Sequence, residues 1–127
     1  MGAHHGILIV VEDDDDLRSW MEQLLQDEGY LVLPAREGAE ALERMRGVAR
    51  GYARRVAAIV DLDMPGVNGW ELIARMRGDL ELREIPVLVV SGHDARPPQG
   101  QVMRVLQKPC RRPELLAAVA CLIPPGS

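Results

Sequence analysis

The stretch Ile7-Leu8-Ile9-Val10-Val11-Glu12-Asp13 decides the fold, because five consecutive aliphatic residues run directly into acid. A short run rich in β-branched residues is typical of a strand that is buried on both faces of a parallel sheet. Residues 56–60 repeat this pattern and end in Asp61-Leu62-Asp63, and residues 87–90 end in Ser91. We therefore expect buried parallel strands whose carboxyl ends carry polar side chains.

The segments between these runs have the spacing of amphipathic helices. Leu17, Trp20, Met21, Leu24 and Leu25 share one helical face, on which we interpret Trp20 and Met21 as core residues. Aspartates at 14–16 can cap this helix, and Gly29 ends it. The pattern also predicts strands over 30–33 and 103–106 and helices over 38–45, 72–76 and 113–123. Alternating strands and helices indicate an α/β fold with a parallel sheet covered on both faces.

The composition fits one globular domain and excludes several classes of protein. The chain has 127 residues, of which 47% are hydrophobic and 27% charged, and it has no Phe, so the core must be aliphatic. A net charge of −4 argues against direct nucleic-acid binding, and no apolar run is long enough to cross a membrane. Cys110 and Cys121 are expected to be buried, reduced thiols of a cytoplasmic protein.

Polar residues at the ends of the expected strands predict a single site. The carboxyl ends of parallel strands meet at one edge of the sheet, where ligands bind in such folds. That edge would bring together Glu12 and Asp13 with Asp61, Ser91 and Lys108. Crowded carboxylates without His or Cys favour a hard cation, and Mg²⁺ is the natural candidate.

The same residues have the chemistry of phosphoryl transfer. A carboxylate such as Asp61 can act as a nucleophile and form an acyl phosphate. Phosphoryl transfer needs positioning and neutralisation of charge, which Mg²⁺ and the Lys108 ammonium would supply. The Ser91 hydroxyl can donate a hydrogen bond to a phosphoryl oxygen.

Taken in order, these motifs resemble the receiver domains of response regulators. The resemblance is carried by Val10-Val11-Glu12-Asp13, Asp61-Leu62-Asp63-Met64-Pro65-Gly66, Val89-Val90-Ser91-Gly92 and Lys108-Pro109. It covers about residues 6 to 123, and five weak motifs at successive strand ends are together specific.

The resemblance implies a flavodoxin-like, doubly wound sheet of five parallel strands in the order 2-1-3-4-5. It also implies Mg²⁺ held by Glu12, Asp13, Asp61 and the backbone carbonyl of Asp63. Asp61 would be the phosphoacceptor, and a sensor histidine kinase or phosphotransfer protein would be the phosphodonor. The chain would not be an enzyme beyond its own phosphorylation and autodephosphorylation, and an effector domain or target protein would receive its signal. In this family the peptide bond between the residues at 108 and 109 is cis.

The boundaries and some details of the sequence qualify this picture. We expect a disordered tail over 1–6, the receiver domain over 7–123, and a tail or linker stub over 124–127. Val105 and Cys110 stand where the family usually has aromatic residues. The segment 92–107 contains paired prolines and little helical period, so we expect the fourth helix of the family to be short or irregular.

Two smaller hypotheses and two alternative functions remain open. Asp63 and His93 each lie two positions beyond a site residue, where they could tune the lifetime of the phosphoryl group. The basic connection with arginines at 46, 50, 54 and 55 could touch an acidic partner. The first alternative function is a pseudo-receiver, a protein-interaction module that phosphorylation does not regulate. The second is a haloacid-dehalogenase-type phosphatase, because Asp61-Leu62-Asp63 also fits its nucleophile motif.

Overall fold

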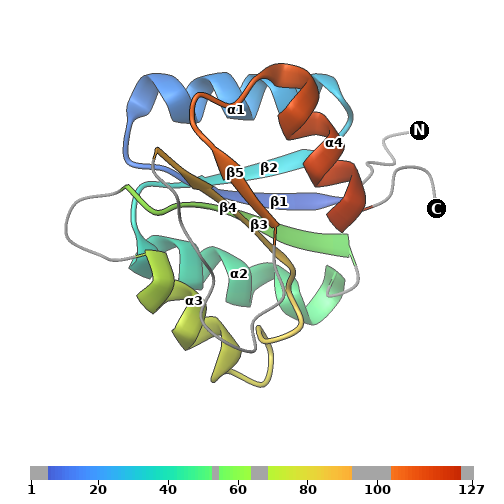
Figure 1. Ribbon diagram of the computed structural model, residues 1–127. Helices are drawn as coiled ribbons and strands as arrows, with labels where there is room; N and C mark the ends of the chain where they lie inside the picture. Colours follow the sequence, from blue (N-terminus) through green and yellow to red (C-terminus); the bar gives the residue numbers. More distant parts are fainter. Residues whose placement is uncertain (1–5, 53–54, 64–68, 93–103, 124–127) are drawn as a thin grey trace.

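Five parallel strands form one sheet in the order β2-β1-β3-β4-β5, which confirms the predicted order (Figure 1). The computed structural model describes residues 6–52, 55–63, 69–92 and 104–123, without the side chains of 50–52. The strands are β1 (Ile7–Val11), β2 (Leu31–Ala35), β3 (Val56–Asp61), β4 (Val87–Ser91) and β5 (Arg104–Gln107). The helices among the described residues are α1 (Asp15–Asp27), α2 (Gly38–Tyr52), α3 (Gly69–Arg77) and α4 (Arg112–Leu122).

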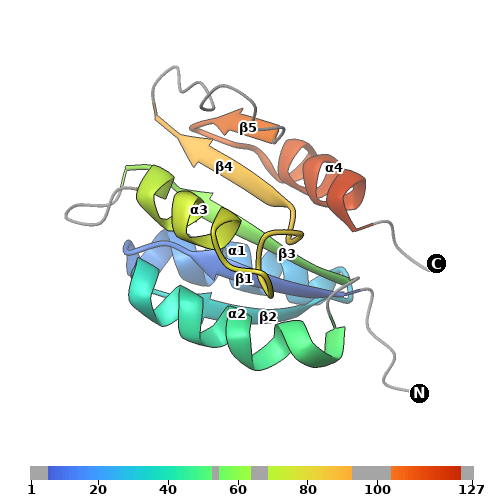
Figure 2. The same ribbon diagram turned by 90° about the horizontal axis from the view of Figure 1, so that it is seen from below.

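Helices cover both faces of the sheet, so the molecule has three layers. α1 and α4 lie on one face, and α2 and α3 lie on the other (Figures 1 and 2). Because side chains alternate along a strand, β1 divides its residues between the two faces. Ile7, Ile9 and Val11 pack with α2 and α3, whereas Leu8 and Val10 pack with α1 and α4. Both cores are almost entirely aliphatic, as the composition predicts.

The first helix begins where its acidic residues predict. The Asp14 side chain caps α1 by accepting a hydrogen bond of 3.0 Å from the Leu17 N–H. Asp15 and Asp16 lie in the first turn, where the helix dipole favours negative charge. Gly29 follows the helix with a φ of 97°, a conformation that glycine adopts without strain. Because its cap, Asp14, follows Glu12 by two residues, the helix starts at the edge of the sheet that carries Glu12.

The helix α2 and the strand β2 both extend further than the sequence pattern predicts. α2 continues from Gly38 to Tyr52, although a helix ending at residue 45 and a loop holding Arg46 were expected. The cost of Gly47 inside the helix is only about 1 kcal/mol, and the burial of Ala49 against the core favours continuation. β2 runs through Pro34, which is tolerated because β2 is an edge strand that, among the described strands, pairs with β1 alone.

Burial differs from expectation at two side chains. Trp20 was predicted to lie in the core, but it is 40% exposed, whereas Met21 is buried. The helical face that includes both residues is wider than the surface α1 can bury, so Trp20 lies at its margin. Cys121 is exposed and Cys110 is only partly buried, so the expectation of two buried thiols was wrong.

Several predictions fall on residues outside the described ranges. These are the short or irregular helix expected within 92–107, of which 93–103 are not described, the role of His93, the side chains of Arg50 and Arg54, and residues 1–5 and 124–127 of the tails. In the described part of the chain, no helix combines the length and the apolar character that a membrane span requires.

Candidate functional site

Glu12 and Asp13 stand at the carboxyl end of β1, one buried and the other exposed. Glu12 is 1% exposed, and its Oε2 accepts a hydrogen bond of 3.1 Å from the Asp14 N–H. Arg18 of α1 donates from Nη1 to the Glu12 backbone carbonyl at 2.9 Å. The start of α1 therefore fixes both the side chain and the backbone of Glu12.

Asp61 is the last residue of β3 and is 3% exposed. Its Oδ1 accepts a hydrogen bond of 2.8 Å from the Asp63 N–H. The same oxygen lies 3.0 Å from the Lys108 Nζ. Because β1 and β3 are paired neighbours, Asp61 lies beside Glu12 and Asp13, which follow β1.

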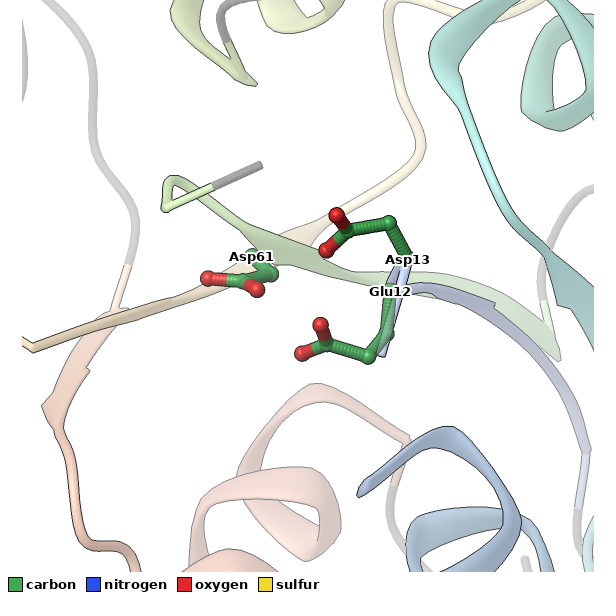
Figure 3. A group of neighbouring side chains, drawn as sticks. All are labelled: Glu12, Asp13 and Asp61. Atoms are coloured by element: carbon green, nitrogen blue, oxygen red, sulfur yellow. The ribbon is translucent and has the colours of Figure 1, made fainter. Parts of the chain in front are cut away.

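Carboxylate oxygens of Glu12, Asp13 and Asp61 form a group that could hold a metal ion. One oxygen from each residue lies within 4.8 Å of the other two, and the three side chains point toward a common space (Figure 3). Oxygen ligands at this spacing suit Mg²⁺, which is typically held by one or two carboxylates together with water and phosphate oxygens. The arrangement therefore fits the ion predicted from the sequence.

The buried carboxyl of Glu12 has a raised pKa, which bears on the binding of a cation. The pKa of Glu12 is raised from 4.5 to about 8, chiefly by burial and then by the neighbouring Asp61 carboxylate, while the Asp14 N–H and Lys108 oppose the increase. Among the described residues, the buried Oε1 atom has no hydrogen-bond partner, and the Lys108 Nζ lies 3.9 Å away. A divalent cation would supply further positive charge and stabilise the ionised form of Glu12.

Lys108 faces the carboxylates from the loop after β5. Its ammonium lies 3.0 Å from Asp61, 3.4 Å from Asp63 and 3.9 Å from Glu12. Burial alone would lower the pKa of Lys108, but the hydrogen bond to Asp61 and the nearby carboxylate charges raise it overall. The Lys108–Pro109 peptide bond is cis, which confirms that prediction.

Ser91 and Lys108 are held together by the backbone. Ser91 is the buried last residue of β4, and its carbonyl accepts a hydrogen bond of 2.7 Å from the Lys108 N–H. The structure therefore gathers all the side chains that the sequence singles out, Glu12, Asp13, Asp61, Ser91 and Lys108, at one edge of the sheet.

Asp63 has a position that sequence reasoning did not foresee. Its backbone carbonyl was expected to be a metal ligand, and its position two residues beyond Asp61 suggested an influence on the lifetime of the phosphoryl group, but no contact of its side chain was predicted. Its side chain accepts a hydrogen bond of 2.7 Å from the Gly92 N–H, and its Oδ1 lies 3.5 Å from the Ser91 hydroxyl. The spacing from Asp61 to Asp63 was the available signal, because a turn after a strand can return the second side chain to the same edge.

Arg18 was missed altogether, and Gly92 was quoted within a motif without a role of its own. Arg18 gives no local signal, since a basic residue in the first turns of a helix is usually a surface residue. The Gly92 N–H is a backbone group, and its availability depends on how β4 ends.

Known proteins that resemble this chain identify its family. The model of the response regulator receiver domain family matches residues 8–120, nearly the whole described fold. The chain belongs to this family. The polar-differentiation response regulator DivK of Brucella anthropi is 29% identical over 117 residues, which cover 88% of this chain and 91% of DivK.

Solved structures of receiver domains share the fold. The receiver domain of the hybrid histidine kinase CckA is 32% identical, with a TM-score of 0.77 and coverage of 93% of this chain and 99% of that domain. The receiver domain of the sensor histidine kinase PA1611 from Pseudomonas aeruginosa PAO1 is 23% identical, with a TM-score of 0.75 and coverage of 95% and 98%. The latter structure has a magnesium ion coordinated in its active-site cleft. This chain is thus a receiver domain of two-component signalling.

Proposed function

We propose that this receiver domain accepts a phosphoryl group on Asp61 in a Mg²⁺-dependent reaction. The observation that carries the proposal is the position of Asp61, whose carboxylate touches the Lys108 ammonium at 3.0 Å and belongs to the three-carboxylate group. A nucleophile, a candidate metal site and a cation thus lie together at one edge of the sheet. The phosphodonor is a sensor histidine kinase or a phosphotransfer protein.

The reaction forms one bond and breaks another. A carboxylate oxygen of Asp61 attacks the phosphorus of a phosphohistidine, and an acyl phosphate forms as the P–N bond breaks. The bonding electron pair leaves with the imidazole nitrogen, which then takes a proton from water. Because the donor is itself activated, the receiver needs to supply only position and charge neutralisation.

The residues of the chain divide these two tasks. Lys108 neutralises charge on the phosphoryl oxygens, and its backbone bond to Ser91 keeps the ammonium next to the end of β4. The Ser91 hydroxyl donates to a phosphoryl oxygen. Glu12, Asp13, Asp61 and the Asp63 carbonyl are the proposed ligands of Mg²⁺. Bound Mg²⁺ would supply further neutralisation of the negative charge on the phosphoryl group.

Two features of the relatives support the metal and the partner. The PA1611 receiver holds magnesium in its active-site cleft, which agrees with the fit of Mg²⁺ to the carboxylate group here. The receivers of CckA and PA1611 belong to histidine kinases, so a histidine-based phosphodonor agrees with the family. We infer that the same chemistry operates on Asp61.

The test is phosphorylation by a small donor. The protein is incubated with acetyl phosphate and Mg²⁺, and its intact mass is measured. We expect wild type to gain one phosphoryl group, and Asp61→Asn or wild type in EDTA to gain none. The matched control is Asp27→Asn, which removes an exposed carboxylate from α1 and should be modified like wild type. An unmodified wild type would refute the proposal and favour a pseudo-receiver.

A second measurement separates the receiver from a phosphatase. A haloacid-dehalogenase-type enzyme would turn over p-nitrophenyl phosphate many times per molecule. We propose that this chain has no such turnover and releases its own phosphoryl group only by autodephosphorylation. Catalytic release of p-nitrophenol that Asp61→Asn abolishes would contradict this proposal.

A further inference from the structure

We propose that the Asp63 carboxylate is an internal competitor of the phosphoryl group. In the unphosphorylated protein it occupies the hydrogen-bond donors that would hold the phosphoryl oxygens on Asp61, and it must leave them when Asp61 is phosphorylated. This inference rests on the proposed function. It gives the Asp63 side chain a regulatory role, in addition to the role of the Asp63 backbone carbonyl as an expected metal ligand.

Three donors converge on the Asp63 carboxylate. Its Oδ2 accepts from the Gly92 N–H at 2.7 Å and lies 3.4 Å from the Lys108 Nζ. Its Oδ1 lies 3.5 Å from the Ser91 hydroxyl, at the long limit of a hydrogen bond. Donors therefore contact both oxygens of the Asp63 carboxylate, as they would contact the oxygens of a small bound oxyanion.

The same donors face Asp61. The Lys108 ammonium lies between the two carboxylates, 3.0 Å from Asp61 and 3.4 Å from Asp63. A phosphoryl group attached to Asp61 would place its oxygens next to this ammonium and next to the end of β4. Because a donor N–H or hydroxyl hydrogen serves one strong acceptor at a time, Asp63 and the phosphoryl group cannot both use the set fully.

Local structure brings Asp63 into this position. The Asp63 N–H donates to Asp61 Oδ1 at 2.8 Å, which turns the chain back toward the end of β4. Glycine at position 92 permits the close approach, because a Cβ there would lie 3.0 Å from Asp63 Oδ2. A larger residue at this position would press on the carboxylate and weaken its bond to the backbone N–H.

Charge requires the carboxylate to move after phosphorylation. A phosphoryl group brings about two negative charges at neutral pH, and these repel a neighbouring carboxylate. The Asp63 side chain is 28% exposed, so it has a route to solvent. Its departure breaks the contacts of Asp63 with the Ser91 hydroxyl and the Gly92 N–H. The equilibrium between the two states is then set by competition between two anions for one set of donors.

Rates of phosphorylation test the inference. Asp63→Ala and Asp63→Asn are compared with wild type in acetyl phosphate at saturating Mg²⁺. We expect both variants to be phosphorylated about tenfold faster, equivalent to about 1.4 kcal/mol of barrier. The matched control Asp16→Asn removes an exposed carboxylate from the first turn of α1, at the same edge of the sheet, and should stay within about twofold of wild type, as a screened surface charge would.

The amide signal of Gly92 adds a direct readout of the competition. In ¹⁵N-resolved NMR spectra of the unphosphorylated protein, loss of the Asp63 carboxylate should shift this signal. Beryllofluoride, a phosphoryl mimic, should then bind Asp63→Ala more tightly than it binds wild type.

The outcomes distinguish the two proposals. If wild type is not phosphorylated, the proposed function fails. If wild type is phosphorylated but both Asp63 variants are equally fast or slower, the competitor role is wrong and Asp63 instead positions Ser91 and Lys108 for the reaction. An Asp16→Asn variant as fast as Asp63→Asn would also overturn the inference, because net charge alone would then explain the effect.

Discussion

Replacing Glu12 by glutamine should stabilise the folded protein in the absence of divalent cations. Glu12 is 1% exposed, and burial is the largest cause that raises its pKa from 4.5 to about 8. The folded protein therefore favours the neutral side chain. Glutamine has nearly the shape of a protonated glutamate, and its amide can donate to Asp61 while its oxygen accepts from the Asp14 N–H.

The size of the effect follows from proton linkage. Between pH 4.5 and about 8 the folded state keeps a proton on Glu12 that the unfolded state has released. The unfolded state then binds fewer protons, so stability falls as the pH rises through this window. At pH 7, which is about 2.5 pH units above the unfolded pKa, the loss is about 3.4 kcal/mol, from about 1.4 kcal/mol for each unit. Glutamine does not ionise and avoids this loss, and its advantage vanishes toward pH 4.5.

Thermal unfolding in EDTA measures this difference. At pH 7 we expect the melting temperature of Glu12→Gln to exceed that of wild type by roughly 10 °C, and at pH 5 by only about 2–3 °C. In Mg²⁺ the difference in melting temperature between Glu12→Gln and wild type should become smaller or change sign. Wild type gains about 2.7 kcal/mol when the ion is present at a hundred times its dissociation constant, whereas the variant has lost one of its proposed ligands.

The control and the refuting results are specific. Glu43→Gln removes an exposed carboxylate from α2 and should leave stability within about 0.5 kcal/mol at both pH values. A Glu12→Gln protein that is less stable than wild type at pH 7 in EDTA would refute the account of the buried carboxylate. A stability difference that does not grow between pH 5 and pH 7 would do the same. If Mg²⁺ still stabilises the variant as much as wild type, Glu12 is not a ligand.

Three further changes test the site and the fold. Lys108→Met should slow phosphorylation by acetyl phosphate at least about 100-fold, because one charged donor to the phosphoryl oxygens is lost; a rate near that of wild type would remove Lys108 from the mechanism. Gly69→Ala should lower the free energy of unfolding in urea by about 1–2 kcal/mol, because the new Cβ would meet the Leu62 side chain at 2.5 Å. An unchanged urea midpoint would show that this contact relaxes freely. Leu25→Ala in the core should cost about 2–4 kcal/mol by the same assay, whereas Leu80→Ala at an exposed position should cost under about 0.5 kcal/mol; equal losses would contradict the assigned burial.

Much of the fold could be predicted because its signals are local. Two buried runs that end in acid, at Val11 and at Val60, mark β1 and β3 without knowledge of any other element. Element ends were less predictable. Tyr52 lies in α2 because burial of Ala49 outweighs the weak helix propensity of Gly47, and burial depends on what packs against the helix.

The identity of the site was also largely predictable, but its contacts were not. Parallel strands bring their carboxyl ends to one edge, so Glu12, Asp61 and Lys108 had to come near one another once the strand order was known. The resemblance to the receiver family supplied that order. The direction of the Asp63 side chain depends on a turn and on the end of β4, so the spacing from Asp61 suggests the same edge of the sheet but does not encode the contact with Gly92.

The sequence by itself determined the layered α/β architecture, the acidic strand ends and the chemical class of the site. These features follow from the period of hydrophobic residues and from the type of residue at each strand end, which are properties of short segments. Only the tertiary structure decided that Glu12 is buried enough to hold a proton, that Trp20 is exposed, and that Asp63 occupies the Gly92 N–H. Burial and hydrogen bonding are set by atoms from segments far apart in the chain, at distances that must be right to a fraction of an ångström.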